Sequence, residues 1–481
     1  MSLHIEQHNE RPERRHSSSS SGSKHIYDVV GIGFGTTSLA LAASLVEKNC
    51  NAKVLFLERE SQFTWNPEHI LPDKEVGTSF LRDLATTSNP RSEFTFMKFL
   101  HATNQLILFA NNSRLTPTRR LMGHYFRWAA AKIEKLGWVN YGQEGIRVRP
   151  VQSATSKRVS QWQIETRDSK TGAVSTVRAR RIVLATGATP HILAPLKTPQ
   201  IEPLVLHSSS STGLLEKLGS LQATLNIAVV GADQEAVELF HHLHTARGKH
   251  NATLFFPDSA LRPDDHLPSI SDMLEKPESA EGSMPPEVRA RQHSEQQAPK
   301  VHLKTLEHLY EAQYSQKLME PDSSKWRFQI RPLSEVVGAS RIGSGARIVT
   351  KSPRTGEVVT SATVFDVIIS ATGYEFATNM DLVGAVKPLL DASGLTVNRE
   401  YHVNFRRDVL SRDCDNIIYG HANMTMRSRF RLQSMPTPSD EGVSQDNELI
   451  LDSVVLAGSR RTNNYHVYAL EDIIKISTSD M

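Results

Sequence analysis

Short apolar runs and helical repeats alternate along much of this chain, and together they predict a regular order of strands and helices. The apolar runs of strand type are 29–32, 54–57, 182–185, 227–230, 254–256 and 367–370. Helical repeats at 39–46 and 236–243 follow two of these runs after a short turn. Strand, tight turn, helix and strand is the order of a βαβ unit, so the pattern predicts an α/β fold with parallel sheets.

Two such units start far apart in the sequence, and we expect two dinucleotide-binding (Rossmann-like) domains. The expected first domain occupies 25–220 and 365–470, and the expected second domain, 221–364, is inserted into it. Residues 1–24 are polar and serine-rich and lack the apolar stretch of a signal peptide, so we expect a disordered leader. The Pro/Glu/Ser/Gln-rich segment 276–300 is expected to be a surface loop.

The turn after the first strand has the residues that a dinucleotide site needs. Gly33 allows a tight bend, and Gly35 allows the backbone to approach a pyrophosphate next to a helix N-terminus. Ser38 is small where the helix must pack closely on the strand. Glu58 ends the next strand, where a carboxylate can accept hydrogen bonds from a ribose.

The corresponding turn in the second unit is altered. Gly231 keeps the first glycine of the pattern, but Asp233 stands where a close-approach glycine belongs and Glu235 follows at the expected helix start. Two carboxylates next to a phosphate site are repulsive. We therefore expect weakened binding of a second dinucleotide.

Two apolar strands end in the same tripeptide, Ala-Thr-Gly, at 185–187 and 371–373. In open α/β sheets, ligands bind outside the carboxyl ends of the strands, at a switch point. Both tripeptides therefore favour a pair of dinucleotide sites.

Composition excludes several classes of protein. The formal net charge is +3, no basic block stands out, and the chain has two cysteines. We therefore expect no nucleic-acid partner and a reducing, cytoplasmic location. No apolar stretch is long enough for a membrane span. The histidines 241, 242 and 244 point in different directions on a helix, so we expect a solvated face and no metal site.

The stretch 79–96 is the most distinctive part of the chain. It reads Ser-Phe-Leu-Arg-Asp-Leu-Ala-Thr at 79–86, Asn-Pro-Arg-Ser at 89–92 and Phe-Thr-Phe at 94–96. Further matching positions are 56–59, 62–63, Trp65, Arg119, 125–128, 141–142, 207–209, 262–263 and 371–374. Through these residues most of 27–380 resembles the flavin-dependent N-hydroxylating monooxygenases, that is, the lysine N6-hydroxylase and L-ornithine N5-monooxygenase family.

The resemblance implies a function. FAD would bind at Gly33, Gly35, Ser38 and Glu58, and Trp65 would be either a further contact or a core aromatic. NADPH would bind at the second turn, where Gly231 and Gln234 keep positions of the family pattern. Reduced FAD would form a C4a-hydroperoxide with O2 and pass one oxygen to the primary amine of an ornithine- or lysine-like compound. Members serve siderophore and other hydroxamate pathways in secondary metabolism, and many are tetramers, so a homo-oligomer stays open. No catalytic side chain is assigned.

The chain departs from the family pattern at several positions. Besides Asp233 and Glu235, Pro257 replaces an arginine that in the family faces the NADP 2′-phosphate. In the substrate region Arg82 stands where members have a lysine, and Ser271 stands where members have an asparagine. Arginine does not reproduce a compact ammonium group. NADPH binding and substrate identity are therefore the open points.

Three hypotheses remain. The first is a divergent FAD- and NADPH-dependent N-hydroxylase. The second is an FAD-binding pseudoenzyme that has lost NADPH-driven turnover, and the third is a monooxygenase with a changed substrate or reductant.

Overall fold

The computed structural model describes residues 25–468 with gaps. The gaps are 66–70, 72, 77–78, 113–114, 157, 211–212, 214, 216–223, 246–249, 264–298, 376–379, 393, 396–401, 407–408, 411–416, 420–427, 434–447, 454 and 459–464. The expected leader 1–24, Ser271 and most of the expected loop 276–300 lie outside the described residues.

The first sheet has seven strands in the order β3-β2-β1-β6-β5-β4, with β17 paired to β6. Their bounds are β1 Ile26–Ile32, β2 Val54–Glu58, β3 Val139–Tyr141, β4 Gln143–Gln152, β5 Val159–Asp168, β6 Val174–Leu184 and β17 Ile417–Tyr419. The strands β3, β2, β1 and β6 are parallel, whereas β5 and β4 continue the sheet in antiparallel pairing. β17 shows that the chain returns to this sheet after the second domain.

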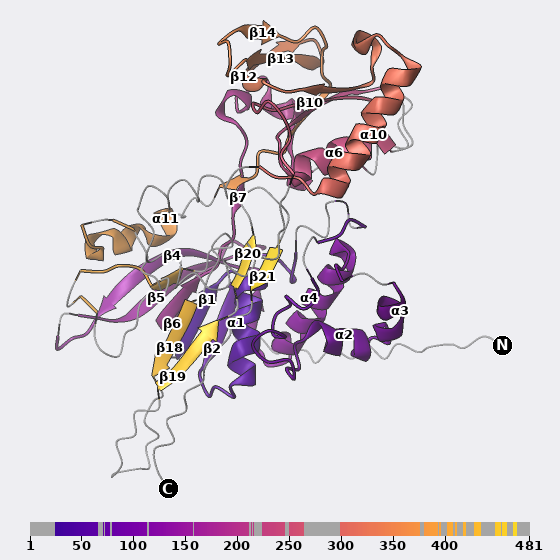
Figure 1. The fold of residues 1–481 in the computed structure, drawn as a ribbon. Coiled ribbons are helices and arrows are strands. Elements are labelled where there is room, and N and C mark those ends of the chain that lie inside the picture. Colours follow the sequence, from indigo (N-terminus) through magenta and orange to yellow (C-terminus); the bar gives the residue numbers. More distant parts are fainter. Residues whose placement is uncertain are drawn as a thin grey trace, which may run out of the picture.

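Four helices, α1 Thr36–Glu47, α2 Phe96–Ala102, α3 Leu106–Asn111 and α4 Arg119–Glu134, lie on one side of the first sheet (Figure 1). Buried residues of α1, α2 and α4 form one core with β1 and β2. The opposite face of the sheet packs on α11 Met380–Val383 and the 3-10 helix Gly384–Leu389. The first domain therefore has its sheet covered on both faces.

The second sheet is fully parallel, with the order β11-β10-β9-β15-β8. Its strands are β8 Val205–His207, β9 Asn226–Val230, β10 Asn251–Phe255, β11 Phe328–Arg331 and β15 Val367–Ser370. One face packs on α6 Gln234–Thr245 and α10 Leu303–Met319. The other packs on a small antiparallel sheet of β12 Glu335–Ile342, β13 Gly345–Lys351 and β14 Val358–Thr360.

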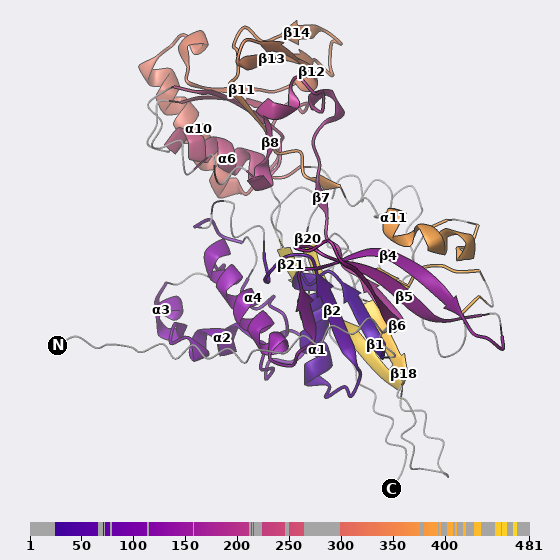
Figure 2. The ribbon, with the colours of Figure 1, turned by 180° about the vertical axis from the view of Figure 1, so that it is seen from behind.

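Both chain crossings between the domains pair with each other. β7 Thr189–Pro190 and β16 Tyr374–Glu375 form a two-stranded antiparallel ribbon at the junction, seen from both sides in Figure 1 and Figure 2. His191 accepts a bond from the Thr372 hydroxyl at its carbonyl oxygen (2.6 Å), and its own N–H donates to Gly373 O (3.0 Å). These bonds tie the two crossings together.

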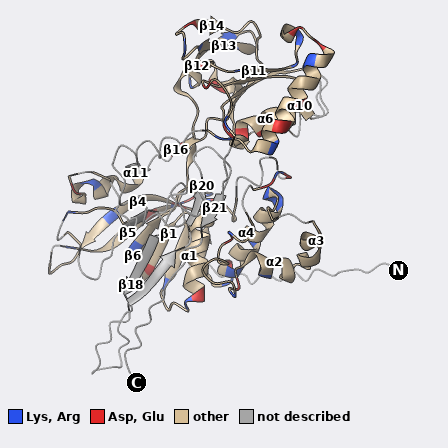
Figure 3. Ribbon diagram, viewed as in Figure 1, with Lys and Arg blue, Asp and Glu red and all other residues tan. Residues whose placement is uncertain are grey.

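The remaining elements are short. They are the strands β18 Ser428–Gln433, β19 Glu448–Ser453, β20 Val455–Gly458 and β21 Tyr465–Tyr468, paired as β18–β19 and β20–β21, and the 3-10 helices Ala194–Leu196, Glu202–Leu204, Ser208–Ser210 and Ser323–Lys325. Basic and acidic residues are interspersed over both domains (Figure 3).

The predicted α/β fold with two Rossmann-like domains is confirmed, and all six predicted apolar runs fall in or at the end of strands of the two sheets. The sheets nevertheless extend beyond the expected inserted domain at both ends. β8 at 205–207 and β15 at 367–370 belong to the second sheet, although they lie outside 221–364. The reason is that β15 pairs between β9 and β8, a long-range contact that no local pattern reports.

Candidate dinucleotide-binding sites

Gly33 makes the tight turn after β1. Its φ is +94°, and a Cβ atom there would collide with the backbone carbonyl of Ala185, at the end of β6. Its N–H donates to Leu57 O (2.8 Å) in β2. Glycine is therefore required both by the backbone conformation and by the closeness of the neighbouring strand.

Gly35 leaves the start of α1 open. No atom of a described residue lies within 4 Å of the position that its Cβ would take, and no described side chain caps the helix there. Buried Ser38 instead donates its hydroxyl to Gly33 O (2.7 Å), which holds the turn against the helix. An uncapped helix N-terminus beside open space is the arrangement that receives a pyrophosphate, so these residues fit an FAD phosphate group.

Glu58 ends β2 beside this turn. One carboxylate oxygen accepts from Phe34 N (2.7 Å) and the other from Glu60 N (2.9 Å). Each oxygen has a further lone pair, so the group can still accept a hydroxyl donor. Its ribose role stays a prediction.

The second turn repeats the backbone construction of the first. Gly231 has φ +149°, its added Cβ would collide with Ala371 O, and its N–H donates to Phe255 O (3.0 Å). The first residue of each Ala-Thr-Gly also donates to its neighbouring strand, Ala185 N to Ile32 O (2.9 Å) and Ala371 N to Val230 O (2.8 Å). Both tripeptides thus form the floor under a glycine turn.

Asp233 distinguishes the two turns chemically. It is buried, and its Oδ1 accepts from Ala236 N (3.0 Å), three residues on, which is the geometry of a helix N-cap. α1 leaves its N-terminus open, whereas α6 has a carboxylate of its own chain there. Buried Glu235 follows in the first helical turn of α6.

Gln234 is engaged within the protein. Its side-chain Nε2 donates to Glu238 Oε1 (2.6 Å) and to the Thr305 hydroxyl (3.1 Å), and its Oε1 accepts from His302 N (2.8 Å). The predicted NADPH contact of Gln234 stays a prediction, but the amide clearly joins α6 to the start of α10. Pro257 is exposed just after β10.

The segment that carries Arg82 is held by a buried carboxylate. Arg82 is half-buried, and the next residue, Asp83, accepts from Ala85 N (2.9 Å), Thr86 N (2.5 Å), the Thr86 hydroxyl (2.6 Å) and Phe96 N (2.5 Å). Burial raises the pKa of the Asp83 carboxyl, while these hydrogen bonds oppose the rise. Sequence reasoning gave Asp83 no role, because only its burial distinguishes it from a surface acid.

Tyr125 braces the same segment from α4. Its hydroxyl donates to Phe94 O (2.6 Å) and accepts from Leu84 N (3.0 Å). The ring and hydroxyl are fully buried, and burial raises the tyrosine pKa well above its usual value. The backbone around Arg82 is therefore fixed on both sides.

Trp65 lies in the core of the first domain. It is 4 % exposed, and its ring meets Phe126 edge-on with centroids 5.2 Å apart. This packing accounts for a large aromatic at position 65. A contact between Trp65 and FAD stays a prediction.

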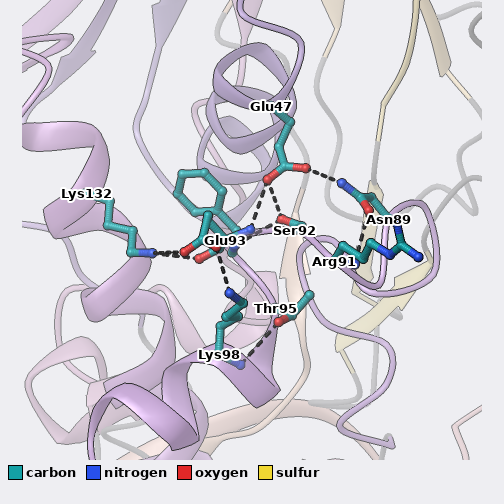
Figure 4. Close-up of polar contacts among 9 residues, drawn as sticks. Glu47, Asn89, Arg91, Ser92, Glu93, Thr95, Lys98 and Lys132 are labelled. Carbon is teal, nitrogen blue, oxygen red and sulfur yellow. Dashed lines mark hydrogen bonds and ion pairs between the residues drawn. The ribbon is translucent and has the colours of Figure 1, made fainter.

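Glu47, at the end of α1, holds the Asn-Pro-Arg-Ser stretch (Figure 4). Its carboxylate accepts from the Asn89 amide (2.7 Å), the Ser92 hydroxyl (2.6 Å) and Glu93 N (3.1 Å). Because the first turn lies at the other end of α1, this stretch acts as a structural tether in the first domain.

We expected the histidines of α6 to form a solvated face, but they are half-buried. His241 stacks on His308 of α10 with ring centroids 5.8 Å apart, and His244 meets Phe328 edge-on at 4.6 Å. Among the described residues no group of three potential metal ligands occurs, and none of the described helices has the length and apolarity for a membrane crossing.

Comparison with known proteins agrees with this geometry. The family model for L-lysine 6-monooxygenase/L-ornithine 5-monooxygenase matches residues 25–376. The L-ornithine N(5)-monooxygenase of Ajellomyces capsulatus is 33% identical over 466 residues, which cover 93% of this chain and 94% of the relative. An L-ornithine N(5)-oxygenase of Arthrobotrys oligospora is 31% identical, covering 82% of each chain.

Solved structures are similar over the same range. The ornithine hydroxylase PvdA of Pseudomonas aeruginosa has a TM-score of 0.71 at 25% identity, and it covers 82% of this chain and 92% of its own. The ornithine N-hydroxylase of Kutzneria sp. 744, solved with reduced FAD, NADP+ and L-ornithine, has a TM-score of 0.71 at 29% identity, with the same coverage of each chain. The chain belongs to the L-lysine 6-monooxygenase/L-ornithine 5-monooxygenase family of flavin-dependent N-hydroxylating enzymes.

Proposed function

We propose that this enzyme binds FAD at the first turn and NADPH at the second, and hydroxylates the side-chain amine of L-ornithine. The observation that carries the proposal is the open start of α1 at Gly35, beside a glycine turn that tolerates no side chain at Gly33. The named activity of the relatives, L-ornithine N5-oxygenation, supports the choice of substrate. Bound FAD, once reduced by NADPH, would supply the oxygen-transfer chemistry.

The overall reaction balances as follows. NADPH, a proton, O2 and the amine give NADP+, the hydroxylamine and water. The protein must bind both dinucleotides, exclude bulk water and hold the amine in its neutral form. In this proposal Glu58 accepts from the FAD ribose, and Arg82 and Ser271 contact the amino acid. Trp65 supports the flavin domain from its core.

The domain assignment is part of the proposal. We place the FAD domain on the first sheet and the NADPH domain on the second, so the NADPH domain includes β8 and β15 and extends to the β7–β16 ribbon. Siderophore or hydroxamate biosynthesis in the cytoplasm, O2 as co-substrate and a homo-oligomeric state are the expected setting.

One specific observation favours an alternative. Because Asp233 caps α6 with a carboxylate, the second turn is a less favourable binding site for an anion than the first turn is. A member that keeps FAD but has lost NADPH-driven turnover would have this feature, as would a member with another reductant.

Anaerobic stopped-flow reduction tests the proposal. The purified, FAD-loaded protein is mixed with NADPH, and bleaching of the flavin absorbance is followed. Rapid bleaching, then hydroxylated L-ornithine in air with L-lysine as the comparison amine, is the expected result. A protein that holds FAD but shows no bleaching would instead be the pseudoenzyme or depend on another reductant. Bleaching with NADPH but hydroxylation of a different amine would overturn only the substrate.

A further inference from the structure

A buried ion pair joins the two domains. Arg119, the first residue of α4 in the first domain, places Nη2 2.6 Å from Glu238 Oε2 on α6 of the second domain. The side chains are 2% and 4% exposed. In both ribbon views the first turn of α4 points toward α6 (Figure 1 and Figure 2).

Glu238 is also held within its own domain. Its second oxygen, Oε1, accepts from Gln234 Nε2 (2.6 Å), and Gln234 in turn contacts Thr305 and the backbone N–H of His302. A continuous chain of hydrogen bonds therefore runs from α4 through α6 to the start of α10. Gln234 and Glu238 are four residues apart, so they lie on one face of α6.

The segment before α4 strengthens the contact. Leu71 of the first domain is buried in the core of the second domain, with Ile227 and Phe240 among the members of that core. Lys74 O accepts from Arg119 N (2.8 Å), and the Glu75 carboxylate accepts from the Thr116 hydroxyl (2.6 Å). The residue that reaches across to Glu238 is thus fixed by its backbone.

The ion pair is a weak source of stability but a strong constraint on geometry. Taking two charges out of water costs several kcal/mol, which a well-formed pair only offsets. Burying two apolar side chains would serve stability as well or better. The short, directional contact of a guanidinium with a carboxylate, by contrast, restricts the relative placements that α4 and α6 can take.

We propose that Arg119 and Glu238 are a positioning pair that sets the placement of the second nucleotide turn relative to the flavin domain. α6 begins directly after Gly231–Asp233. A shift of Glu238 therefore moves the rigid helix α6, and with it the turn at the start of that helix. The two crossings of the chain at the β7–β16 ribbon also connect the sheets. The inference rests on the proposed function for its catalytic consequence, but not for its structural one.

The test uses a variant that removes both charges and leaves neither unpaired. Arg119→Met with Glu238→Met keeps side chains of similar length in the buried site. Arg120→Met is the matched control, because Arg120 is the next residue of α4 and pairs with Asp73 at 2.9 Å on the surface, within the first domain. Arg119→Lys keeps the charge with a shorter reach, and it carries the test if the double variant does not fold.

Domain placement is measured by distances between spin labels. Labels are attached to cysteines introduced at exposed His101 in α2 and Glu311 in α10, with Cys50 and Cys414 replaced by serine. We expect a broadened or displaced distance distribution in the double variant, a smaller change in Arg119→Lys, and no change in Arg120→Met. An unchanged distribution in a folded double variant would overturn the proposal, whether or not the protein uses NADPH.

Flavin reduction gives the second readout. We expect reduction by saturating NADPH to slow about 10- to 100-fold in the double variant, since a misplacement of about 1 Å can cost that much. Reduction by dithionite, which needs no nucleotide domain, should stay at the wild-type rate. Equal slowing with both reductants would overturn the positioning role. If the wild type itself is not reduced by NADPH, the proposed function fails while the distance measurement still decides the proposal.

Discussion

Gly35 and Gly33 differ in what a side chain would meet. At Gly33 a Cβ strikes the Ala185 carbonyl oxygen, so any substitution damages the fold itself. At Gly35 a Cβ meets no described atom, and its φ of −84° suits any residue. Gly33 is therefore required by the fold, whereas the space at Gly35 matters only for a ligand that binds at the start of α1.

Gly35→Ala should weaken FAD binding without harming the apoprotein. The new methyl group would occupy the space through which a pyrophosphate approaches α1, and we expect the FAD dissociation constant to rise roughly tenfold or more. Calorimetric titration of apoprotein with FAD measures this, and thermal unfolding of the apoprotein should be unchanged. Gly384→Ala, also in open space, is the control. A Gly35→Ala protein with wild-type FAD affinity would remove the first turn from the FAD site.

Asp233 caps α6 and also places a negative charge at the second turn, and one substitution can separate these two effects. Asparagine caps a helix as well as aspartate does but has no charge. We expect Asp233→Asn to lower the KM for NADPH roughly three- to tenfold, as removal of about 1 kcal/mol of repulsion would do. Steady-state NADPH oxidation at constant ionic strength is the measurement, with thermal unfolding to show that the cap is kept. A rise in the KM for NADPH would mean that the carboxylate helps to bind the nucleotide.

Arg82 lies on a segment so well braced that its own substitution should act locally. We expect Arg82→Ala to raise the KM for L-ornithine about tenfold or more, the loss expected for one charged hydrogen-bonding contact. Anaerobic flavin reduction by NADPH should stay near the wild-type rate. Arg91→Ala, an exposed arginine in the neighbouring stretch, should change neither quantity. If Arg82→Ala leaves the KM unchanged, the amine pocket lies elsewhere.

The end of α1 makes a tether that can be tested through stability. Glu47→Ala removes the acceptor for three donors, two of them from residues of the Asn-Pro-Arg-Ser stretch, and leaves buried Ser92 without this partner. We expect the free energy of unfolding to fall by about 1–3 kcal/mol. Chemical denaturation measures it, and FAD affinity should not change. Lys98→Ala removes an exposed ion pair of the same cluster and should cost about 1 kcal/mol or less.

The strands and helices that could be predicted are those with a clear apolar pattern in their own sequence. The apolar runs that became β1, β2, β9 and β15 were predictable, as were α1 and α6, because burial on a parallel sheet requires near-continuous apolar residues. β4 and β5 were not predicted, since they are long antiparallel strands without the near-continuous burial of the parallel strands and without a turn glycine pattern like theirs. The capping role of Asp233 had a readable signal, an aspartate immediately before a helical repeat.

Long-range pairing decided what the sequence could not predict. The domain limits at 221 and 364 followed composition and motif positions, whereas the sheet is completed by β8 and β15 from outside those limits. Arg119 was visible as a family-like residue, but nothing in its neighbourhood identifies Glu238 as its partner. A contact between helices of two domains can be identified only when the positions of both helices in the structure are known.

The junction between the domains contains titratable groups as well as the ion pair, and this predicts a loss of stability in acid. His241 lies on α6 beside Lys74 of the first domain and His308 of α10, and burial, reinforced by Lys74 and the neighbouring histidines, lowers its pKa from 6.5 to about 4. Burial also lowers the pKa of His242 and of His244. The folded protein therefore resists protonation of histidines that the unfolded chain protonates readily near pH 6.5.

The sign of the pH effect follows from linkage. Above pH 6.5 both states hold His241 neutral, so the stability is fully present. As the pH falls from 6.5 toward 4 the unfolded state takes up protons that the folded state does not, and the free energy of unfolding falls. We expect His241→Gln to lose less stability than the wild type between pH 7.5 and pH 5, measured by denaturant unfolding at both values. His101→Gln, at an exposed histidine of α2, should follow the wild type. Equal losses in His241→Gln and the wild type would mean that protonation of this junction does not contribute to acid unfolding.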